Sequence, residues 1–155
     1  MNWTWYRFHE LGVDNLYDAL ALRCEVFILE QGPFLDTDGV DRQCWHLLGR
    51  SDKGSGTGTL HAYLRVVDAG VKYVEPSIGR VITSAATRGT GLGKTLMAEG
   101  LRFTDQTLPG HSIRISAQAR LRRFYQGFGF ADDKPEHIED GIPHVEMLRL
   151  ARLAG

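Results

Sequence analysis

The chain has 155 residues, of which 43% are hydrophobic and 24% charged, and we expect residues 1–155 to form one globular domain. Its formal net charge of −1, from 18 Lys and Arg against 19 Asp and Glu, disfavours nucleic acid and anionic membranes as partners. No segment approaches the roughly 20 apolar residues of a membrane span, and the first residues lack the pattern of a secretion signal. We therefore expect a cytoplasmic protein with a small partner.

Strands are expected where β-branched and aromatic residues cluster or alternate. In chain order these segments are residues 3–8, 45–50, 62–67, 78–84, 112–117 and 143–150. Helices are expected where apolar residues recur at three and four positions. These segments are residues 14–30, the stretch between a glycine-rich turn at 89–93 and Pro109, and residues 121–128. This order indicates a mixed α/β fold in which antiparallel pairing dominates, with a parallel component where helices connect strands.

Ala19, Leu22, Val26 and Leu29 define the apolar face of the first helix, and Asp14 is expected to cap its first turn.

Cys24 in the first helix and Cys44 before a strand form no paired motif. We expect both to be reduced and Cys24 to lie in the core, with a catalytic thiol open as an alternative for either. Arg23 interrupts the apolar helix. We expect it to pair with a nearby carboxylate, such as a loop aspartate, while contact with an anionic substrate stays open.

Three aspartates follow the first helix, at positions 36, 38 and 41. Asp36 and Asp38, two positions apart, resemble the opening of a calcium loop. However, the twelfth position counted from Asp36 is Leu47, where an EF-hand requires a bidentate Glu. We therefore predict a solvated loop and no metal site.

The segment IGRVITSAATRGTGLGKTL, residues 78–96, joins a strand to a helix through a turn with three glycines. Glycines leave backbone amides uncovered, and the first amides of a helix have no internal partner. The positive end of the helix dipole adds to the attraction for anions. We predict that this turn binds a pyrophosphate, with Arg88 or Lys94 supplying a full charge.

Spacing separates the classes of nucleotide site that use such a turn. A Walker loop has four residues between its first glycine and Gly-Lys-Ser/Thr, and here there are only three. A dinucleotide fingerprint requires G-x-G-x-x-G near the first strand, whereas this turn reads G-x-G-x-G and lies past the middle of the chain. Both NTP and NAD are disfavoured.

The motif R-x-x-G-x-G at residues 88–93, placed after a strand, resembles the coenzyme A signature of the GNAT superfamily of acyltransferases. The resemblance continues through Gln118 and Phe124-Tyr125 to Gly129-Phe130, in the order and separation of that family. Outside this core, three segments resemble the ElaA-like branch: LRCEVFILEQ, IGRVITS and EDGIPH. Residues 32–34, Gly-Pro-Phe, depart from that branch, where a cysteine before the proline is expected.

The resemblance implies a splayed, mostly antiparallel central sheet flanked by helices. It implies acetyl-CoA as the donor and a primary amine of a small molecule or peptide as the acceptor, with direct attack and no covalent enzyme intermediate. Tyr125 would protonate the departing thiolate. The residues implied in coenzyme A binding are Val81, Ile82, Thr83, Arg88, Gly89, Thr90, Gly91, Leu92, Gly93, Lys94 and Gln118.

An amine acceptor arrives protonated, so a general base is needed. The candidates are His46, Glu139, Asp140 and His144. We favour Glu139 and His144, because EDGIPH gathers acidic and imidazole groups around a Gly-Ile-Pro turn, as in a loop that borders a substrate pocket.

Two other functions fit the same motifs. A non-catalytic sensor could bind acyl-CoA without turnover, and a thioester hydrolase could use water as the acceptor. The hydrolase is disfavoured because no activated nucleophile or metal site is visible. A homodimer is left open.

Overall fold

The computed structural model describes residues 1–32, 35–52 and 58–152. The strands are β1 (Asn2–Arg7), β2 (Cys44–Arg50), β3 (Leu60–Val67), β4 (Ser77–Thr83), β5 (Ile113–Gln118), β6 (Ala131–Asp132), β7 (His137–Glu139) and β8 (Ile142–Arg149). The helices are α1 (Gly12–Arg23), α2 (Leu92–Thr107) and α3 (Arg122–Gln126), and a π-helical segment (Cys24–Leu29) extends α1. Single 3-10 turns lie at Phe8–Glu10, Asp41–Gln43, Ala85–Thr87 and Ala119–Leu121.

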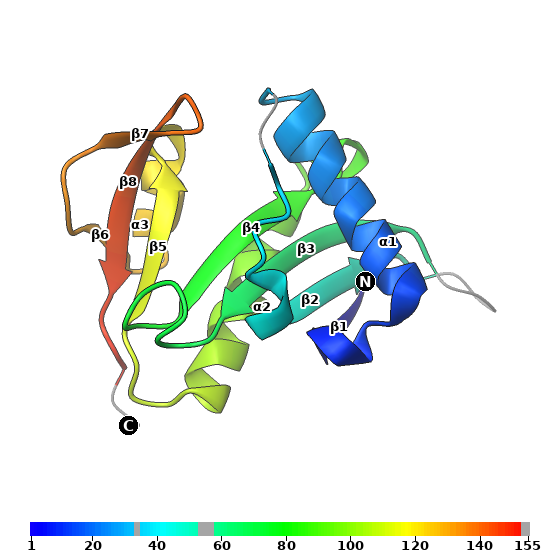
Figure 1. Ribbon diagram of the computed structural model, residues 1–155, viewed down its shortest axis with the longest axis horizontal. Coiled ribbons are helices and arrows are strands. Elements are labelled where there is room, and N and C mark those ends of the chain that lie inside the picture. The colour runs from blue at the N-terminus through cyan, green and yellow to red at the C-terminus, as the bar shows by residue number, and fades with distance from the viewer. Residues whose placement is uncertain (33–34, 53–57, 153–155) are drawn as a thin grey trace.

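The strands form two antiparallel sheets, one in the order β1-β2-β3-β4 and the other in the order β5-β8-β6, with β7 also paired to β8. Helix α1 covers one face of the first sheet and α2 the other (Figure 1). Within the described residues, no helix has both the length and the apolar character needed to cross a membrane.

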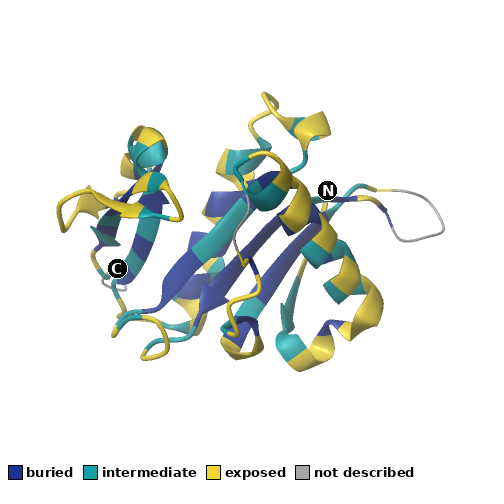
Figure 2. Ribbon diagram, turned by 45° about the horizontal axis from the view of Figure 1, so that its top comes forward, coloured by how far each residue is buried: buried dark blue, intermediate teal, exposed yellow. Residues whose placement is uncertain are grey.

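The first sheet is buried on both faces because successive side chains of a strand point to opposite sides. Leu48 and Tyr63 pack against the α1 side, in one hydrophobic cluster. Leu47 and Leu64 pack against the α2 side, in the other. Gly100 lets α2 approach closely, since a Cβ at this position would lie 2.8 Å from Leu64 Cδ2. Figure 2 shows buried central strands and exposed outer helix faces.

The two sheets separate between β4 and β5. These edge strands run in the same direction and diverge (Figure 1). Near their beginnings, the backbone N–H of Arg114 donates to the carbonyl of Pro76 at 3.1 Å. The predicted splayed, mostly antiparallel sheet is confirmed, and its parallel component is this diverging pair of strands rather than a hydrogen-bonded ladder.

A β-bulge in β4 accounts for part of this divergence. Tyr63 pairs with Ile82 and Arg65 with Gly79, so Leu64 lies opposite two residues, Arg80 and Val81. Arg80 has a φ of 52°, a left-handed conformation that costs a residue with a side chain about 1–3 kcal/mol. A bulge bends its strand and increases the local twist, which turns the end of β4 away from β5.

A largely buried arginine–aspartate network stabilises this conformation. Its members are Arg23, Asp36, Asp38, Asp41, Arg65 and Arg80, of which Asp38 and Arg80 are in part exposed. Arg80 Nε donates to Asp36 Oδ1 at 2.9 Å, and Arg23 Nε donates to Asp36 Oδ2 at 2.9 Å. Arg23 and Arg65 also donate to Asp41 Oδ1, at 2.7 and 2.8 Å.

The prediction of a solvated loop is therefore wrong for Asp36 and Asp41, which are only 6% and 8% exposed. The reason is that arginines from α1, β3 and β4 point inward and need counter-charges there. The prediction that Arg23 pairs with a loop aspartate is confirmed.

Three expectations for the first helix are also wrong. Cys24 is exposed, because it lies off the face formed by Ala19, Leu22 and Val26. Leu29 is exposed as well, since the wider π-helical turn rotates it out of register with that face. Helix α1 begins at Gly12, so Asp14 lies within the first turn and makes no capping hydrogen bond.

The other predicted strands and helices are confirmed in order, with ends shifted by a few residues. The sequence patterns did not predict the short strands β6 and β7. Two predicted features lie in part outside the described residues. They are the middle of the predicted hairpin loop between β2 and β3, and two residues of the segment Gly-Pro-Phe, which differs from the ElaA-like branch.

Replacing Asp41 should destabilise the protein strongly. Asp41→Ala leaves Arg23 and Arg65, each 1% exposed, without one of their counter-charges. Breaking a buried pair in this way costs about 3–5 kcal/mol, measured as the free energy of unfolding in denaturant. Asp52→Ala is the control, because Asp52 pairs with the N-terminus at an exposed site, which contributes about 0–1 kcal/mol. Equal losses in the two variants would contradict the role of the network.

Lowering the pH should protonate Asp41 and thereby remove part of the stability that this carboxylate provides. Burial alone would raise the pKa of Asp41, but hydrogen bonds and charges from Arg23 and Arg65 lower it below its ordinary value. A lowered folded-state pKa stabilises the protein above the unfolded-state pKa, and this contribution is lost as the pH falls below about 4. Asp41→Ala should therefore lose less stability in acid than the wild type, as measured by denaturant unfolding at a series of pH values.

Candidate active site

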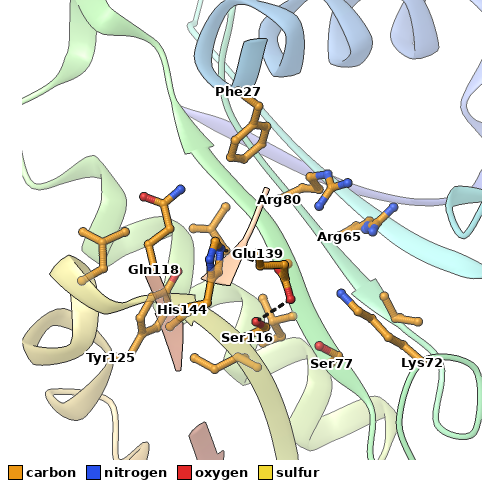
Figure 3. A pocket seen from close by; sticks show the side chains of 17 residues that line it. Phe27, Arg65, Lys72, Ser77, Arg80, Ser116, Gln118, Tyr125, Glu139 and His144 are labelled. Atoms are coloured by element: carbon orange, nitrogen blue, oxygen red, sulfur yellow. Dashed lines mark hydrogen bonds and ion pairs between the residues drawn. The ribbon is translucent and has the colours of Figure 1, made fainter. Parts of the chain in front are cut away.

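A cavity of about 110 Å³ lies where β4 and β5 diverge. Its wall includes the bulge residues Arg80 and Val81 on one side and β5 on the other, and α3, β7 and β8 each contribute side chains. Figure 3 shows these side chains converging on one space. Since both facing strands are sheet edges, their unpaired backbone groups add donors and acceptors to the wall.

Three of the predicted catalytic residues, Tyr125, Glu139 and His144, line this cavity together. His144 Nε2 lies 3.7 Å from Glu139 Oε2. On the other side of the ring, Nδ1–H donates to the carbonyl of Ile142 at 2.7 Å. Because a carbonyl oxygen only accepts, the neutral imidazole keeps its proton on Nδ1 and presents a lone pair at Nε2.

Glu139 is a carboxylate in this setting. Burial alone would raise its pKa, but a hydrogen bond from His137, the neighbouring charges of His144 and Lys72, and a hydrogen bond from Ser116 together lower it below its ordinary value. The side chain therefore supplies a negative charge beside His144 Nε2, which would stabilise an imidazolium or an incoming ammonium.

Tyr125 is 8% exposed, and burial raises the pKa of its hydroxyl to about 12. Its hydroxyl makes no hydrogen bond with the described part of the chain, and the residue lines the cavity on the same side as His144 (Figure 3). The phenol is therefore protonated near neutral pH and has a proton to donate.

The other two candidates for a base do not line the cavity. His46 is 1% exposed. Its Nε2–H donates to the Asp41 carbonyl at 2.8 Å, and its Nδ1 accepts from the Tyr63 hydroxyl at 2.7 Å. Burial lowers the pKa of His46, so it is a neutral structural group. Asp140 occupies a turn, with a φ of 51°.

The EDGIPH segment is a β-hairpin, and the predicted Gly-Ile-Pro turn is wrong. Asp140 and Gly141 both have positive φ, 51° and 76°, and connect β7 to β8 as a two-residue turn. Asp-Gly is a strong sequence signal for such a turn, and it would have predicted the hairpin. The pairing sets Glu139 opposite Ile142 and His137 opposite His144.

The two cysteines are unsuited to a catalytic role here. Cys44 is the first residue of β2 and is buried, and burial raises the pKa of its thiol to about 12. Neither Cys24 nor Cys44 lines the cavity. In the described residues no three His, Cys, Asp or Glu side chains are grouped to hold a metal ion.

A groove leads from the cavity toward the glycine-rich turn. Val81, Gln118 and Leu121 line both spaces, and the groove continues along Thr83 to Arg88. Ile82 also borders the groove but packs mainly toward α1, where it is 4% exposed.

The glycine-rich turn presents free backbone donors at the beginning of α2. Gly89 and Gly91 have φ values of 79° and 84°, and a Cβ at either position, or at Gly93, would meet no atom within 4 Å. Acceptors within the described residues reach none of the amides of Gly89, Gly91, Leu92, Gly93 and Lys94. The turn is thus open toward an external anion.

Three residues of the predicted cofactor site make contacts within the chain. Arg88 forms an exposed ion pair with Glu30 at 2.7 Å. Thr90 donates its amide to the Thr87 carbonyl at 3.4 Å, so this amide is not free. Gln118 donates to the side chain of Gln31 and accepts from Arg120, each at 3.0 Å, which ties the end of β5 to the segment after α1.

A second groove lies between α2 and α3. Lys94 and Thr95 border it on the α2 side, and Arg123, Phe124 and Phe128 on the α3 side. It combines two cations with two aromatic rings next to the open turn, a suitable surface for a charged, planar group.

Sequence reasoning missed several cavity residues, among them Phe27, Lys72, Ser77 and Ser116. The sequence could have indicated Arg80 as a site residue, because this charged residue interrupts the strand pattern IGRVIT. The loop residue Lys72 had none, since its position depends on how the loop between β3 and β4 folds over the cavity.

Comparison with known proteins gives a consistent result. Residues 62–150 match the family model described as an acetyltransferase (GNAT) domain. The chain is 39% identical over 153 residues to ElaA of Escherichia coli K12, covering 96% of each chain. It is 41% identical over 149 residues to a UPF0039 protein of Synechocystis, covering 96% of this chain and 94% of the relative.

Two solved structures are similar along almost the full chain. An acyl-CoA N-acyltransferase from Pseudomonas aeruginosa matches with a TM-score of 0.88 and 37% identity, covering 96% of this chain and 98% of that one. The crystal structure of Escherichia coli ElaA matches with a TM-score of 0.86 and 38% identity, over the same shares. The fold, the order of the motifs and these relatives agree, and the chain therefore belongs to the GNAT acetyltransferase family, in the branch that contains ElaA.

Proposed function

We propose that this protein transfers an acetyl group from acetyl-CoA to a primary amine of a small molecule or peptide by direct attack. The observation that carries the proposal is the convergence of an open anion-binding turn and a set of acid–base side chains on the same split between β4 and β5. We place the reaction in the cytoplasm, a location supported by the free thiols of Cys24 and Cys44.

The chain has surfaces suited to each part of coenzyme A. The free amides from Gly89 to Lys94 and the α2 dipole suit the pyrophosphate. The groove along Val81 and Thr83 suits the pantetheine arm, which would pair with the free edge of β4 as an added strand. The groove between α2 and α3 suits the nucleotide, with Arg123 near its phosphate. When bound, the thioester supplies the activated acetyl group.

Glu139 and His144 would prepare the acceptor. The Glu139 carboxylate attracts the ammonium form of the amine, and the Nε2 lone pair of His144 takes a proton from it, directly or through a water. Glu139 then stabilises the imidazolium that results.

Tyr125 would act on the leaving group. Its hydroxyl stays protonated, because burial raises its pKa to about 12, and it donates to the sulfur as the C–S bond breaks and the thiolate leaves. The remaining extra proton on the newly bonded nitrogen then passes to the Tyr125 phenolate, directly or through a water, which restores the hydroxyl. Bulge amides of β4 would orient the thioester carbonyl and stabilise its developing charge.

The alternative function is a non-catalytic sensor of acyl-CoA. Measuring turnover distinguishes this sensor from an acetyltransferase. Release of free thiol from acetyl-CoA should depend on an added amine, with amino acids, polyamines, aminosugars and peptides as the panel. Calorimetry on the same sample measures coenzyme A binding. Binding without acceptor-dependent release across the panel would favour the sensor, and release without an acceptor would indicate hydrolysis.

Tyr125→Phe removes the proposed acid and keeps the ring. The expected result is a kcat lower by about 100-fold with an unchanged Kd for coenzyme A. Because the hydroxyl stays protonated, this factor should be constant from about pH 6 to about pH 9. An unaltered kcat across that range would remove Tyr125 from the mechanism.

Gly91→Asp and Gly91→Asn form a matched pair for the pyrophosphate site. The two side chains have nearly the same size and share the strain of a φ of 84°, but only aspartate adds a negative charge beside the phosphates. Gly91→Asp should bind coenzyme A at least about tenfold more weakly than Gly91→Asn by calorimetry. Equal affinities would place the pyrophosphate elsewhere.

Glu139→Gln tests the charge beside His144. The amide keeps the shape but not the attraction for an ammonium, so kcat/KM for the amine should fall by roughly 10- to 100-fold. The Kd for coenzyme A should not change. Asp140→Asn is the control, since Asp140 is a neighbouring carboxylate that does not line the cavity. An equal loss in both variants would indicate a general effect of the hairpin.

A further inference from the structure

Building on the proposed function, we infer that the acceptor carries a carboxylate near its amine. Lys72, Ser77 and Arg65 form the site that binds this group. The amine-binding end of the cavity, at Glu139 and His144, and this donor-rich end are two parts of one acceptor site.

Lys72 provides the charge of the proposed site. It comes from the loop between β3 and β4 and lines the cavity, with its ammonium directed inward (Figure 3). Within the described residues, no carboxylate lies at ion-pair distance from this ammonium. By contrast, Arg65 and Arg80 line the same cavity but are paired with aspartates of the network. Burial lowers the pKa of Lys72, and the charge of Glu139 offsets this only in part, so an anion beside the ammonium would further stabilise its charged form.

Arg65 and Ser77 provide two further donors that lack acceptors. The Arg65 side chain is 1% exposed, and its Nη atoms contact Asp38 and Asp41, but its buried Nε–H has no hydrogen-bond partner. Ser77 is 4% exposed, and its hydroxyl forms no hydrogen bond with the described part of the chain. A buried donor without a partner, such as Arg65 Nε–H, is unfavourable. The Ser77 hydroxyl can in addition donate to an acceptor group of a ligand in the cavity.

The order of the side chains sets the kind of molecule that fits. In Figure 3, Tyr125, His144 and Gln118 lie at one side of the cavity, Glu139 and Ser116 in the middle, and Lys72 and Ser77 at the other side. An amine held near Glu139 and His144 therefore leaves the donor end for a second, anionic group of the same small molecule. A polyamine would instead place a second cation beside Lys72, which is unfavourable.

The test compares matched pairs of acceptors, each an amino acid and the amine formed by removing its carboxylate: histidine with histamine, tyrosine with tyramine, lysine with cadaverine. Wild-type protein should show a kcat/KM at least about tenfold higher for the acid of a pair, the factor expected for one hydrogen bond to a charged group. Lys72→Met should lose this preference, so that the acid and the decarboxylated amine of a pair react with similar kcat/KM, and Lys72→Arg should retain part of it.

Lys134→Met is the matched control, because Lys134 is a surface lysine, 59% exposed, outside the cavity. It should keep the wild-type preference. Preference for the decarboxylated amines in wild type, or an unchanged preference in Lys72→Met, would overturn the anionic site while leaving acetyl transfer intact.

A second measurement does not depend on turnover. Calorimetry with coenzyme A present compares binding of an N-acetylamino acid with that of the matching N-acetylamine. The site is supported if wild-type protein binds the acid more tightly than the amine and Lys72→Met loses this difference. This result would support the site even if the protein showed no turnover, an outcome that would contradict the proposed function alone. Equal binding of acid and amine overturns the site.

Discussion

The largely buried arginine–aspartate network is the interaction on which the active-site geometry depends. Asp36 contacts both Arg23 from α1 and Arg80 from β4, so one carboxylate connects a helix to the bulged strand. Arg80 adopts a left-handed backbone conformation that is unfavourable for an arginine. The ion pairs to its side chain offset this cost. They therefore help to maintain the bulge that turns β4 away from β5.

The split between the two sheets turns an ordinary sheet interior into a binding site. In a continuous sheet, the facing edges of β4 and β5 would be hydrogen-bonded to each other. Here they are linked near Pro76 and Arg114 and then separate, which leaves backbone groups free for a ligand. The same opening admits side chains from β8 and α3. Backbone donors, a proton acceptor at His144 and a proton donor at Tyr125 thereby come to line one small cavity.

Two unfavourable features lie at this cavity. They are the left-handed backbone of Arg80 and the buried Nε–H of Arg65, which has no hydrogen-bond partner. In the described residues, one other buried side-chain donor lacks a partner, Arg149 Nε, which lies outside the cavity. A protein optimised only for stability would remove such features, and their grouping is typical of sites that bind a ligand. The proposed acceptor carboxylate would supply an acceptor at this end of the cavity.

The amino-acid sequence by itself determined the elements whose signals are local. Period-two and period-3.6 patterns predicted most strands and helices, and the glycines at 89, 91 and 93 before a helix predicted the open turn with free backbone amides. The EDGIPH segment indicated Glu139 and His144, although its hairpin turn was placed wrongly. The tertiary structure decided everything that depends on partners distant in the chain: the burial of Asp36 and Asp41, the exposure of Cys24, the structural role of His46 and the position of Lys72. A charge or a donor acquires its role from what surrounds it, and those surroundings exist only after the chain has folded.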